Sequence, residues 1–417
     1  MKTQWMLGEE HEMVRQTAER FARERLREGY QSREAIPTMS RALMREMGAL
    51  GLIAPNVPEA FGGIGAPSLV NGLICEAIAY GDFNLSYLNM VTPLICDVLL
   101  RHASPEVQEQ YIPDLAAGES ICALGLTEPR GGSDASHLVV SATRKGDSFI
   151  FKGEKTSISF AEQASSMLTF ARTNPDDSGP RGVSAFVVPL DLPGVSRIAF
   201  NDIGTKPVGR GSVFFDDVEV PANALIGREN TGFTQVMEGF DLSRILIALQ
   251  CIGAAQASVD ETWAYVSERE AFGYRLSKFQ GVSFPLAEHE SQLESMRTLC
   301  YHALALRDAG KRHTREAAMV KWMAPKFCTD IIQNCLLLHG HYGYTIDLPH
   351  QQRLRDVMGL QIGDGTAQIM KTIIARETIG SVGRGLCCQT KEPMGAPGTR
   401  GLWASHTHTG LPLAPNG

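Results

Sequence analysis

The chain has 417 residues, of which 43% are hydrophobic and 20% are charged, as expected for a globular protein with a large buried core. A formal net charge of -7 gives no electrostatic reason to expect nucleic acid or an anionic membrane as a partner. The nine cysteines lack metal-type spacing, so we expect reduced thiols in a cytoplasmic protein. We expect neither a signal peptide nor a membrane span, because no apolar run approaches the roughly 20 residues that a span needs.

Helix-forming residues dominate the first part of the chain. Segments 15–27 and 40–47 are rich in strong helix formers, and a loop rich in glycine and proline, 55–67, separates helical stretches. We predict an N-terminal helical domain over residues 1–120, whose helices begin near Glu9.

The composition changes at about Ile121 to short β-type runs broken by Gly, Pro and Asp turns. Near the end of this region Phe214, Val218 and Val220 share the even spacing of one strand face. We predict a middle β-domain over residues 121–227 with a β-barrel-like sheet.

Helical patterns return after Gly227. A stripe of apolar residues at helical spacing, typical of a helix buried on one face, consists of Leu293, Met296, Cys300, Ala303 and Leu304. We predict a C-terminal helical bundle over residues 228–380 and, because residues 381–417 have little to bury, a disordered tail. The expected fold class is therefore α+β, with several domains.

Three short blocks contain residues that are suited to chemistry. The first, residues 126–134, combines hydroxyls, carboxylates and glycines after an apolar run, and it is either a polar turn or a loop that binds a polar ring. The second contains Arg269 near the end of an expected helix, where a guanidinium is either solvated or available to a pyrophosphate. In the third, Asp364 lies between two glycines before an expected helix at 367–377, where Asp364 or Thr366 could also serve as an N-cap.

Together these blocks resemble the flavin-dependent acyl-CoA dehydrogenase family. The resemblance covers roughly residues 5 to 380 and includes the segment 58–63 in the first domain. It implies FAD as cofactor, an acyl-CoA substrate, a homotetramer and an electron-transfer flavoprotein as electron acceptor.

The resemblance also implies which residues bind FAD. Thr127 corresponds to a residue at the isoalloxazine edge, Ser159 to a hydroxyl near flavin N5, and Arg269 to an arginine that reaches the FAD of a neighbouring subunit. The chain departs from the usual pattern at Ser157, which replaces an aromatic residue, and at Leu337 and His341, which replace a glutamine and a glycine. The full expected cofactor set is Leu126, Thr127, Gly132, Ser133, Ser157, Ser159, Arg269, Phe272, Gln280, Leu337, Gly340, His341, Thr366 and Gln368.

Asp364 occupies the position at which most of the family has a catalytic glutamate, so it is the expected base. Some branches place their base before the arginine of the 240–244 segment, but this chain has Ser243 there. The aspartate resembles that of the cyclohexanecarboxyl-CoA type of dehydrogenase, which favours a cyclic or branched acyl group. The expected substrate-binding residues are Ser133, Asp241, Arg244 and Gly365.

Three alternatives stay open from the sequence alone. The chain could be a flavin oxidase of the nitroalkane-oxidase type, which also uses an aspartate base. It could act on acyl groups bound to a carrier protein, or it could be a flavin-free scaffold subunit, as the changes at Ser157, Leu337 and His341 would allow.

Overall fold

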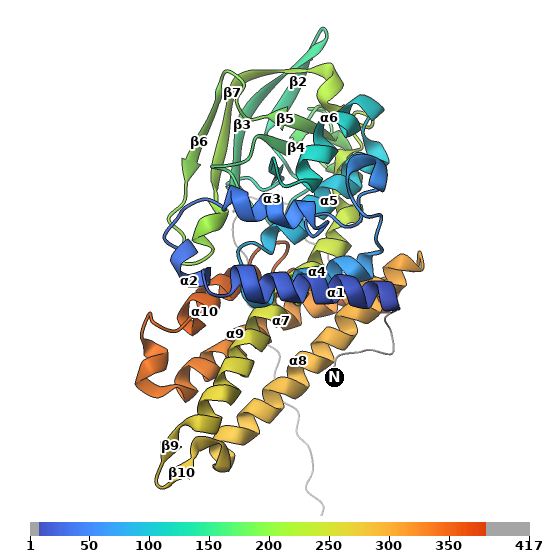
Figure 1. Cartoon of the computed structure of the whole chain (residues 1–417). Coiled ribbons are helices and arrows are strands. Elements are labelled where there is room, and N and C mark those ends of the chain that lie inside the picture. The colour runs from blue at the N-terminus through green and yellow to red at the C-terminus, as the bar shows by residue number, and fades with distance from the viewer. Residues whose placement is uncertain (1–7, 381–417) are drawn as a thin grey trace, which may run out of the picture.

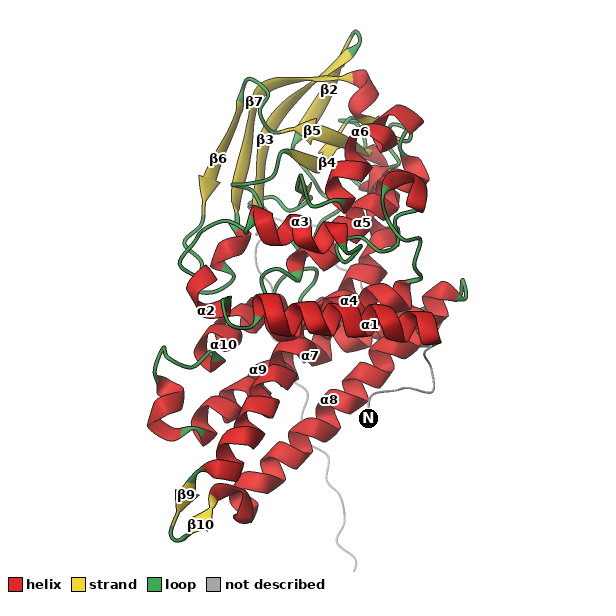
Figure 2. Cartoon of the chain, in the orientation of Figure 1, coloured by secondary structure: helices red, strands yellow, loops and turns green. Residues whose placement is uncertain are grey.

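The computed structural model describes residues 8–380, so the expected tail at 381–417 lies outside the described residues. Helices form the first part of the chain, a sheet the middle part and a second set of helices the last part (Figure 1). Figure 2 shows that the long strands gather at one end of the molecule, while the long helices of the last part extend to the other end. The expected α+β class with three successive parts is confirmed.

The N-terminal helices follow the helix formers noted in the sequence. Ser40, directly before the helix that begins at Arg41, is its N-cap and accepts a hydrogen bond from the Leu43 backbone nitrogen at 3.4 Å. Pro105 opens another helix at its first position, where its missing N–H is tolerated. The helices are α1 (Glu9–Phe21), α2 (Tyr30–Arg33), α3 (Arg41–Ala49), α4 (Ser68–Gly81), α5 (Tyr87–His102) and α6 (Pro105–Ala116), with a π-helical turn at Ala22–Leu26.

The middle part forms one mixed sheet with the strand order β6-β7-β3-β2-β4-β5-β8, and β1 pairs in parallel with β4. Within residues 8–380 this order does not close into a barrel, so the expected barrel-like sheet is an open one. Its strands are β1 (Cys122–Gly125), β2 (Ser141–Lys145), β3 (Ser148–Ile158), β4 (Ser166–Arg172), β5 (Val183–Pro189), β6 (Val195–Ala199), β7 (Gly211–Pro221) and β8 (Leu225–Ile226).

A β-bulge in β7 changes which residues face the core. The pairing of β3 with β7 shifts register between Phe151 and Gly153, and Asp217 of β7 has a φ of 51°. Val213 and Phe215 are buried before the shift, and Val218 and Val220 after it. The expectation that Phe214 shares a face with Val218 was therefore wrong, because the extra residue reverses the alternation.

The C-terminal helices pack around α7, a helix of 37 residues. By length and composition α7 could cross a membrane, but its apolar window is entirely buried by the rest of the fold. The expected apolar stripe of α8 is buried in full. The elements are α7 (Gly232–Glu268), β9 (Glu270–Ala271), β10 (Tyr274–Arg275), α8 (Gln280–Asp308), α9 (Thr314–Leu338), α10 (His350–Met358) and α11 (Ala367–Ile379).

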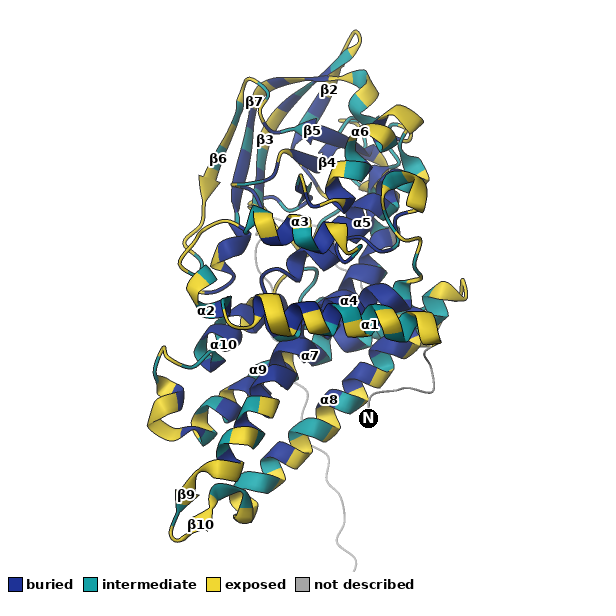
Figure 3. Cartoon of the chain, in the orientation of Figure 1, coloured by how far each residue is buried: buried dark blue, intermediate teal, exposed yellow. Residues whose placement is uncertain are grey.

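One buried carboxylate joins the three parts of the chain. Asp356 of α10 accepts hydrogen bonds from the Tyr30 hydroxyl at 2.6 Å, from Asn84 Nδ2 at 3.1 Å and from the Thr205 backbone nitrogen at 2.5 Å. Its full burial raises the pKa of the Asp356 carboxyl to about 6. Figure 3 shows that most residues in the interior are buried, whereas residues at the end with β9 and β10 are exposed.

Candidate active site

The loop before α11 presents Asp364 in a left-handed backbone conformation. Asp364 has a φ of 54° and Gly365 a φ of 101°, a region that a side chain rarely adopts and glycine adopts freely. Thr366 is the N-cap of α11, with its hydroxyl accepting from the Ile369 backbone nitrogen at 3.5 Å. Thr366 is therefore the N-cap of α11, and Asp364 is not. The Asp364 side chain accepts a hydrogen bond from Ser243 of α7 instead.

The Asp364 carboxylate is directed toward α7. The Ser243 hydroxyl lies 3.1 Å from Asp364 Oδ2 and the same distance from the Phe240 carbonyl oxygen, so its single proton has two acceptors. Ser243 is fully buried, whereas Asp364 is only partly buried. The two positions at which the family resemblance leads us to expect a base, Ser243 and Asp364, are thus in direct contact.

Arg244 and Asp241, two expected substrate residues, form an ion pair beside this contact. Arg244 Nη1 lies 3.0 Å from Asp241 Oδ1, and the Thr314 hydroxyl donates to Asp241 Oδ2 at 2.5 Å. The Nε of Arg244 is buried and has no hydrogen-bond partner among residues 8–380. The Asp241 carboxylate is therefore occupied, while Arg244 keeps a donor that a bound molecule could satisfy.

Lys321 of α9 is a site residue that sequence reasoning missed. Its ammonium group is 1% exposed and donates to the carbonyl oxygens of Leu360 at 2.9 Å and Gly365 at 3.1 Å. Burial lowers the pKa of Lys321 to about 8, and the nearby Asp364 carboxylate opposes that decrease. The signal available in the sequence was a lone lysine within the apolar segment 317–324.

A second buried lysine anchors the loop expected to contact the flavin ring. Lys155 Nζ lies 2.7 Å from Glu128 Oε1 and 3.1 Å from the Leu126 carbonyl oxygen, and both charged side chains are buried. Burial lowers the pKa of Lys155 to about 8 despite the attraction of Glu128. The Glu128 carboxylate also accepts the backbone N–H groups of Val139 and Val140, which fixes both ends of the 128–139 loop.

Thr127 and the segment that contains Ser157 and Ser159 lie side by side. The Thr156 backbone nitrogen donates to the Thr127 carbonyl oxygen at 2.9 Å. Ser157 is exposed with a φ of 57°, and Ser159 is half-buried. In the loop that follows Thr127, Gly132 and Ser133 are exposed. Leu126, directly before Thr127, is buried. These residues leave hydroxyls and backbone groups accessible at the end of β3.

Gln368 is exposed in the first turn of α11, and the remaining expected cofactor residues lie around the end of α7. Arg269 ends α7, and the β9–β10 hairpin that follows leaves Phe272 92% exposed. Tyr265, one turn before Arg269, stacks on His339 with ring centroids 4.4 Å apart, which holds the Leu337–His341 segment beside the same helix end. Gly340 lies directly after the end of α9 with a φ of 62°, the left-handed conformation in which a glycine commonly ends a helix. Gln280, Leu337 and His341 are all exposed.

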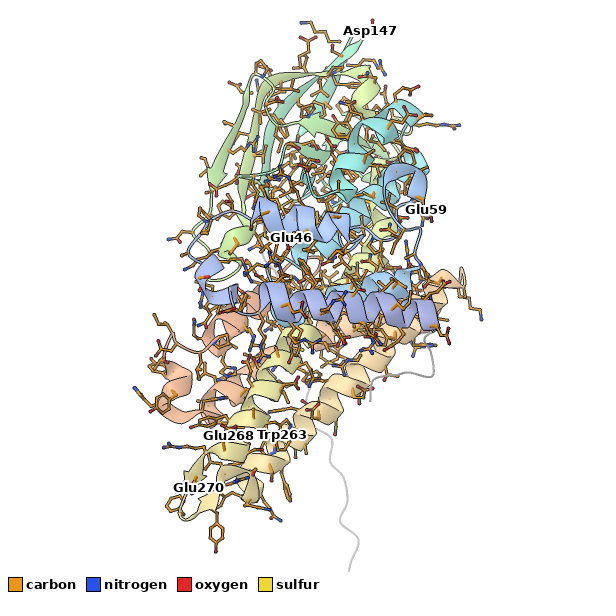
Figure 4. All side chains as sticks on the ribbon, viewed as in Figure 1. Glu46, Glu59, Asp147, Trp263, Glu268 and Glu270 are labelled. Atoms are coloured by element: carbon orange, nitrogen blue, oxygen red, sulfur yellow. The ribbon has the colours of Figure 1, made fainter. Side chains whose placement is uncertain are left out.

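The two groups of expected FAD residues belong to different parts of one protomer. In Figure 4, Glu268 and Glu270 on either side of Arg269 lie at the lower end of the molecule, opposite Asp147 of the sheet. Among the described residues, no side chain or backbone oxygen forms a hydrogen bond or ion pair with the exposed Arg269 guanidinium. A cation and an exposed amide suited to a pyrophosphate thus lie beside the β9–β10 hairpin, and hydroxyls suited to a polar ring lie at the end of β3 in the middle sheet. The donor chemistry fits FAD if two protomers share it.

Comparisons with known proteins agree with this architecture. The sequence matches the N-terminal domain of acyl-CoA dehydrogenases over residues 8–119, the middle domain over 123–218 and the C-terminal domain over 230–379. It is 33% identical over 377 residues to the mitochondrial short-chain specific acyl-CoA dehydrogenase of Bos taurus, covering 90% of this chain and 91% of that protein. It is 31% identical over 372 residues to the caffeyl-CoA reductase-Etf complex subunit CarC of Acetobacterium woodii, covering 88% of this chain and 98% of that protein.

Among solved structures, butyryl-CoA dehydrogenase from Megasphaera elsdenii superimposes with a TM-score of 0.86 at 28% identity, covering 90% of this chain and 99% of that one. Domain matches, curated relatives and fold all point to one family. This chain belongs to the acyl-CoA dehydrogenases and is an FAD-dependent oxidoreductase that acts on CH–CH bonds.

Proposed function

We propose that the protein removes two hydrogens from a cyclic or branched acyl-CoA thioester, of the cyclohexane-1-carboxyl-CoA kind, with Asp364 as the catalytic base. The observation that supports this most directly is the Asp364 carboxylate, which is held by the buried Ser243 hydroxyl at 3.1 Å. A carboxylate held in this way cannot turn freely into solvent. It is oriented before substrate arrives, as a general base requires.

The reaction divides into proton removal and hydride removal. The thioester carbonyl makes the hydrogen on the α-carbon acidic. An oxygen of Asp364 takes that proton, and the carboxylate becomes a neutral carboxylic acid. Bound FAD supplies an acceptor at flavin N5 for the hydride that leaves the β-carbon. A double bond forms between the two carbons, so the protein's own task is to align Asp364 with the α-hydrogen.

An aspartate base constrains the substrate. The side chain is one methylene shorter than glutamate, so its oxygens are set back by about 1.5 Å. A misplacement of about 1 Å can reduce a rate on the order of 100-fold, so the loop or the substrate must compensate. A ring or branch at the α-carbon can bring the α-hydrogen closer to the loop, which supports a cyclic or branched acyl group.

Cofactor binding favours an oligomer. Thr127 and Ser159 would contact the flavin ring bound to one protomer, while Arg269, Phe272 and Gln280 of another would contact its pyrophosphate side. The two groups come from different parts of one protomer, the middle sheet and the helix end next to the β9–β10 hairpin, which supports this arrangement (Figure 1). A homotetramer, as expected from the sequence, stays our proposal for the assembly.

The electron acceptor is proposed to be an electron-transfer flavoprotein. Support comes from the relative in Acetobacterium woodii, whose name describes it as a subunit of an Etf complex. A cytoplasmic location, expected from the sequence, stays part of the same proposal.

The test is an anaerobic titration of the purified holoenzyme with cyclohexanecarboxyl-CoA and, separately, with butyryl-CoA, while the flavin absorbance is followed. The proposal predicts that the cyclic thioester bleaches the flavin and the linear one does so much more slowly. Equal bleaching by both would remove the cyclic specificity and leave a general dehydrogenase. Bleaching by neither, with rapid reoxidation by air after chemical reduction, would favour the oxidase alternative.

A further inference from the structure

We propose that Lys321 is the positioning residue for Asp364: its ammonium group fixes the loop that carries the base and places a positive charge near the base. This inference rests on the proposed role of Asp364. It assigns a function to a buried lysine that the reaction itself does not use.

The two hydrogen bonds of Lys321 span the loop. The Leu360 carbonyl lies four residues before Asp364 and the Gly365 carbonyl directly after it, and one ammonium group bonds both. Between these anchors Ile362 is 73% exposed and Gly363 is exposed, so this stretch has little apolar burial of its own. The position of the Asp364 backbone therefore depends on the lysine.

The left-handed backbone of Asp364 makes such an anchor necessary. A non-glycine residue at a φ of 54° is in a sparsely populated conformation that persists only when the surroundings enforce it. The bond from Lys321 to Gly365 and the bond from Ser243 to the carboxylate enforce it from two helices, α9 and α7. Backbone and side chain of the base are thus held separately.

The charges around Lys321 leave Asp364 as its counter-ion. Among the side chains that the structure describes, Arg244 and Cys251 of α7 and Asp364 of the loop are the groups that interact electrostatically with the Lys321 ammonium. Arg244 is already paired with Asp241, and Cys251 is a buried thiol whose pKa is raised to about 12 by burial. The carboxylate of Asp364 is therefore the negative charge that compensates the buried ammonium near neutral pH.

This pairing has a consequence for the reaction. An acyl group that covers the site removes water from Asp364 and disfavours its charged form. A fixed ammonium nearby favours a negative charge at this position and so opposes that effect. A lysine that only satisfied two carbonyl oxygens would have no such influence on the pH dependence.

The experiment compares three holoenzyme variants in stopped-flow flavin reduction across pH. Lys321→Met removes charge and donors, Lys321→Gln removes the charge but keeps an N–H donor, and Lys326→Gln is the control on the exposed face of the same helix. We expect both Lys321 variants to retain FAD, to reduce flavin on the order of 10- to 100-fold more slowly at neutral pH, and to shift the acid limb of the profile to higher pH. Lys321→Gln should keep more of the rate than Lys321→Met, and Lys326→Gln should match the wild type.

An acid limb that stays in place in Lys321→Gln would overturn the inference, as would a rate within about two-fold of the wild type in either Lys321 variant. If Lys321→Met fails to fold, the pH profile of Lys321→Gln alone tests the inference.

If neither Lys321 variant folds, the inference is tested by the pH dependence of the Tm of Asp364→Asn. The pKa of Lys321 is lower in the folded protein than in the unfolded chain, so deprotonation of Lys321 should raise the Tm as the pH rises above about 8. Without the Asp364 carboxylate the lysine should lose its proton at lower pH. This rise in Tm should therefore begin at lower pH in Asp364→Asn than in the wild type. An unchanged rise would overturn the inference. Wild-type turnover in Asp364→Asn would instead sink the proposed function itself.

Discussion

Ser243 Oγ and Asp364 Oδ2 lie 3.1 Å apart although 121 residues separate them in the chain. Ser243 occupies the position at which some branches of the family place their base, and its hydroxyl contacts Asp364, the base that we propose for this chain. A shorter carboxylate is thereby directed toward α7. This contact suggests how an aspartate can replace the usual glutamate without free rotation.

Removing the Ser243 hydroxyl should slow proton removal and leave the flavin in place. A hydrogen bond to a charged group contributes about 1.5 to 3 kcal/mol, which corresponds to roughly 10- to 100-fold in rate if it is lost at the transition state. Single-turnover flavin reduction by Ser243→Ala should show that decrease with normal FAD content. Ser291→Ala, which removes an exposed hydroxyl of α8, is the matched control, and an equal effect in both variants would refute a specific role for Ser243.

Replacing Arg269 should weaken FAD retention and spare the fold of the protomer. The Arg269 side chain is exposed and forms no hydrogen bond or ion pair within the described part of the chain, so its loss removes no such internal contact. A charge-assisted contact to a pyrophosphate would be worth roughly 10- to 100-fold in the FAD dissociation constant. Fluorescence of released flavin should reveal this in Arg269→Gln. The exposed Arg275 in the same hairpin provides the control variant Arg275→Gln.

Asp356→Asn should change how stability depends on pH. Burial raises the pKa of the Asp356 carboxyl from 3.8 to about 6 in the folded protein, so between these values the unfolded chain ionises while the folded one keeps its proton. The contribution of Asp356 therefore falls as pH rises through 6, by about 3 kcal/mol in all.

An amide at this position cannot titrate. The Tm of the wild type minus that of Asp356→Asn should therefore be more positive at about pH 4.5 than at about pH 7. The unpaired Oδ1 of Asn84 gives a new amide a partner if the Asn84 side chain turns over. A Tm difference that does not vary with pH would mean that Asp356 titrates normally.

Lengthening the base should alter the choice of substrate. Asp364→Glu extends the carboxylate by about 1.5 Å, toward the place that an α-hydrogen of a linear chain would occupy. Relative to the wild type, kcat/KM for butyryl-CoA divided by that for cyclohexanecarboxyl-CoA should rise, on the order of 10-fold or more. A ratio that falls or stays constant would show that base length does not set the specificity.

The sequence was sufficient for the order of the three parts because each has its own periodicity. The stripe from Leu293 to Leu304 could be read from helical spacing alone, and Thr366 could be recognised as an N-cap from its place after a glycine. Local patterns failed at Phe214, because a bulge depends on how β7 pairs with β3 and leaves no mark on alternation within one strand.

The candidate site was less accessible to sequence reasoning. Asp364 could be selected through resemblance, but its partners Ser243 and Lys321 come from helices distant in sequence, and no short-range rule predicts which buried polar groups will meet. The same holds for Lys155 beneath Thr127. A lysine surrounded by apolar neighbours in the sequence indicates burial, and only the fold reveals which carbonyl oxygens it bonds.

The central claim is that Asp364 removes the α-proton. The most direct measurement is stopped-flow reduction of the flavin by cyclohexanecarboxyl-CoA in the wild type and in Asp364→Asn, with FAD content determined for both. The account predicts equal FAD content, bleaching in the wild type, and a rate at least about 1,000-fold lower in the variant, within the range expected for loss of a general base. Bleaching of Asp364→Asn at the wild-type rate would contradict it.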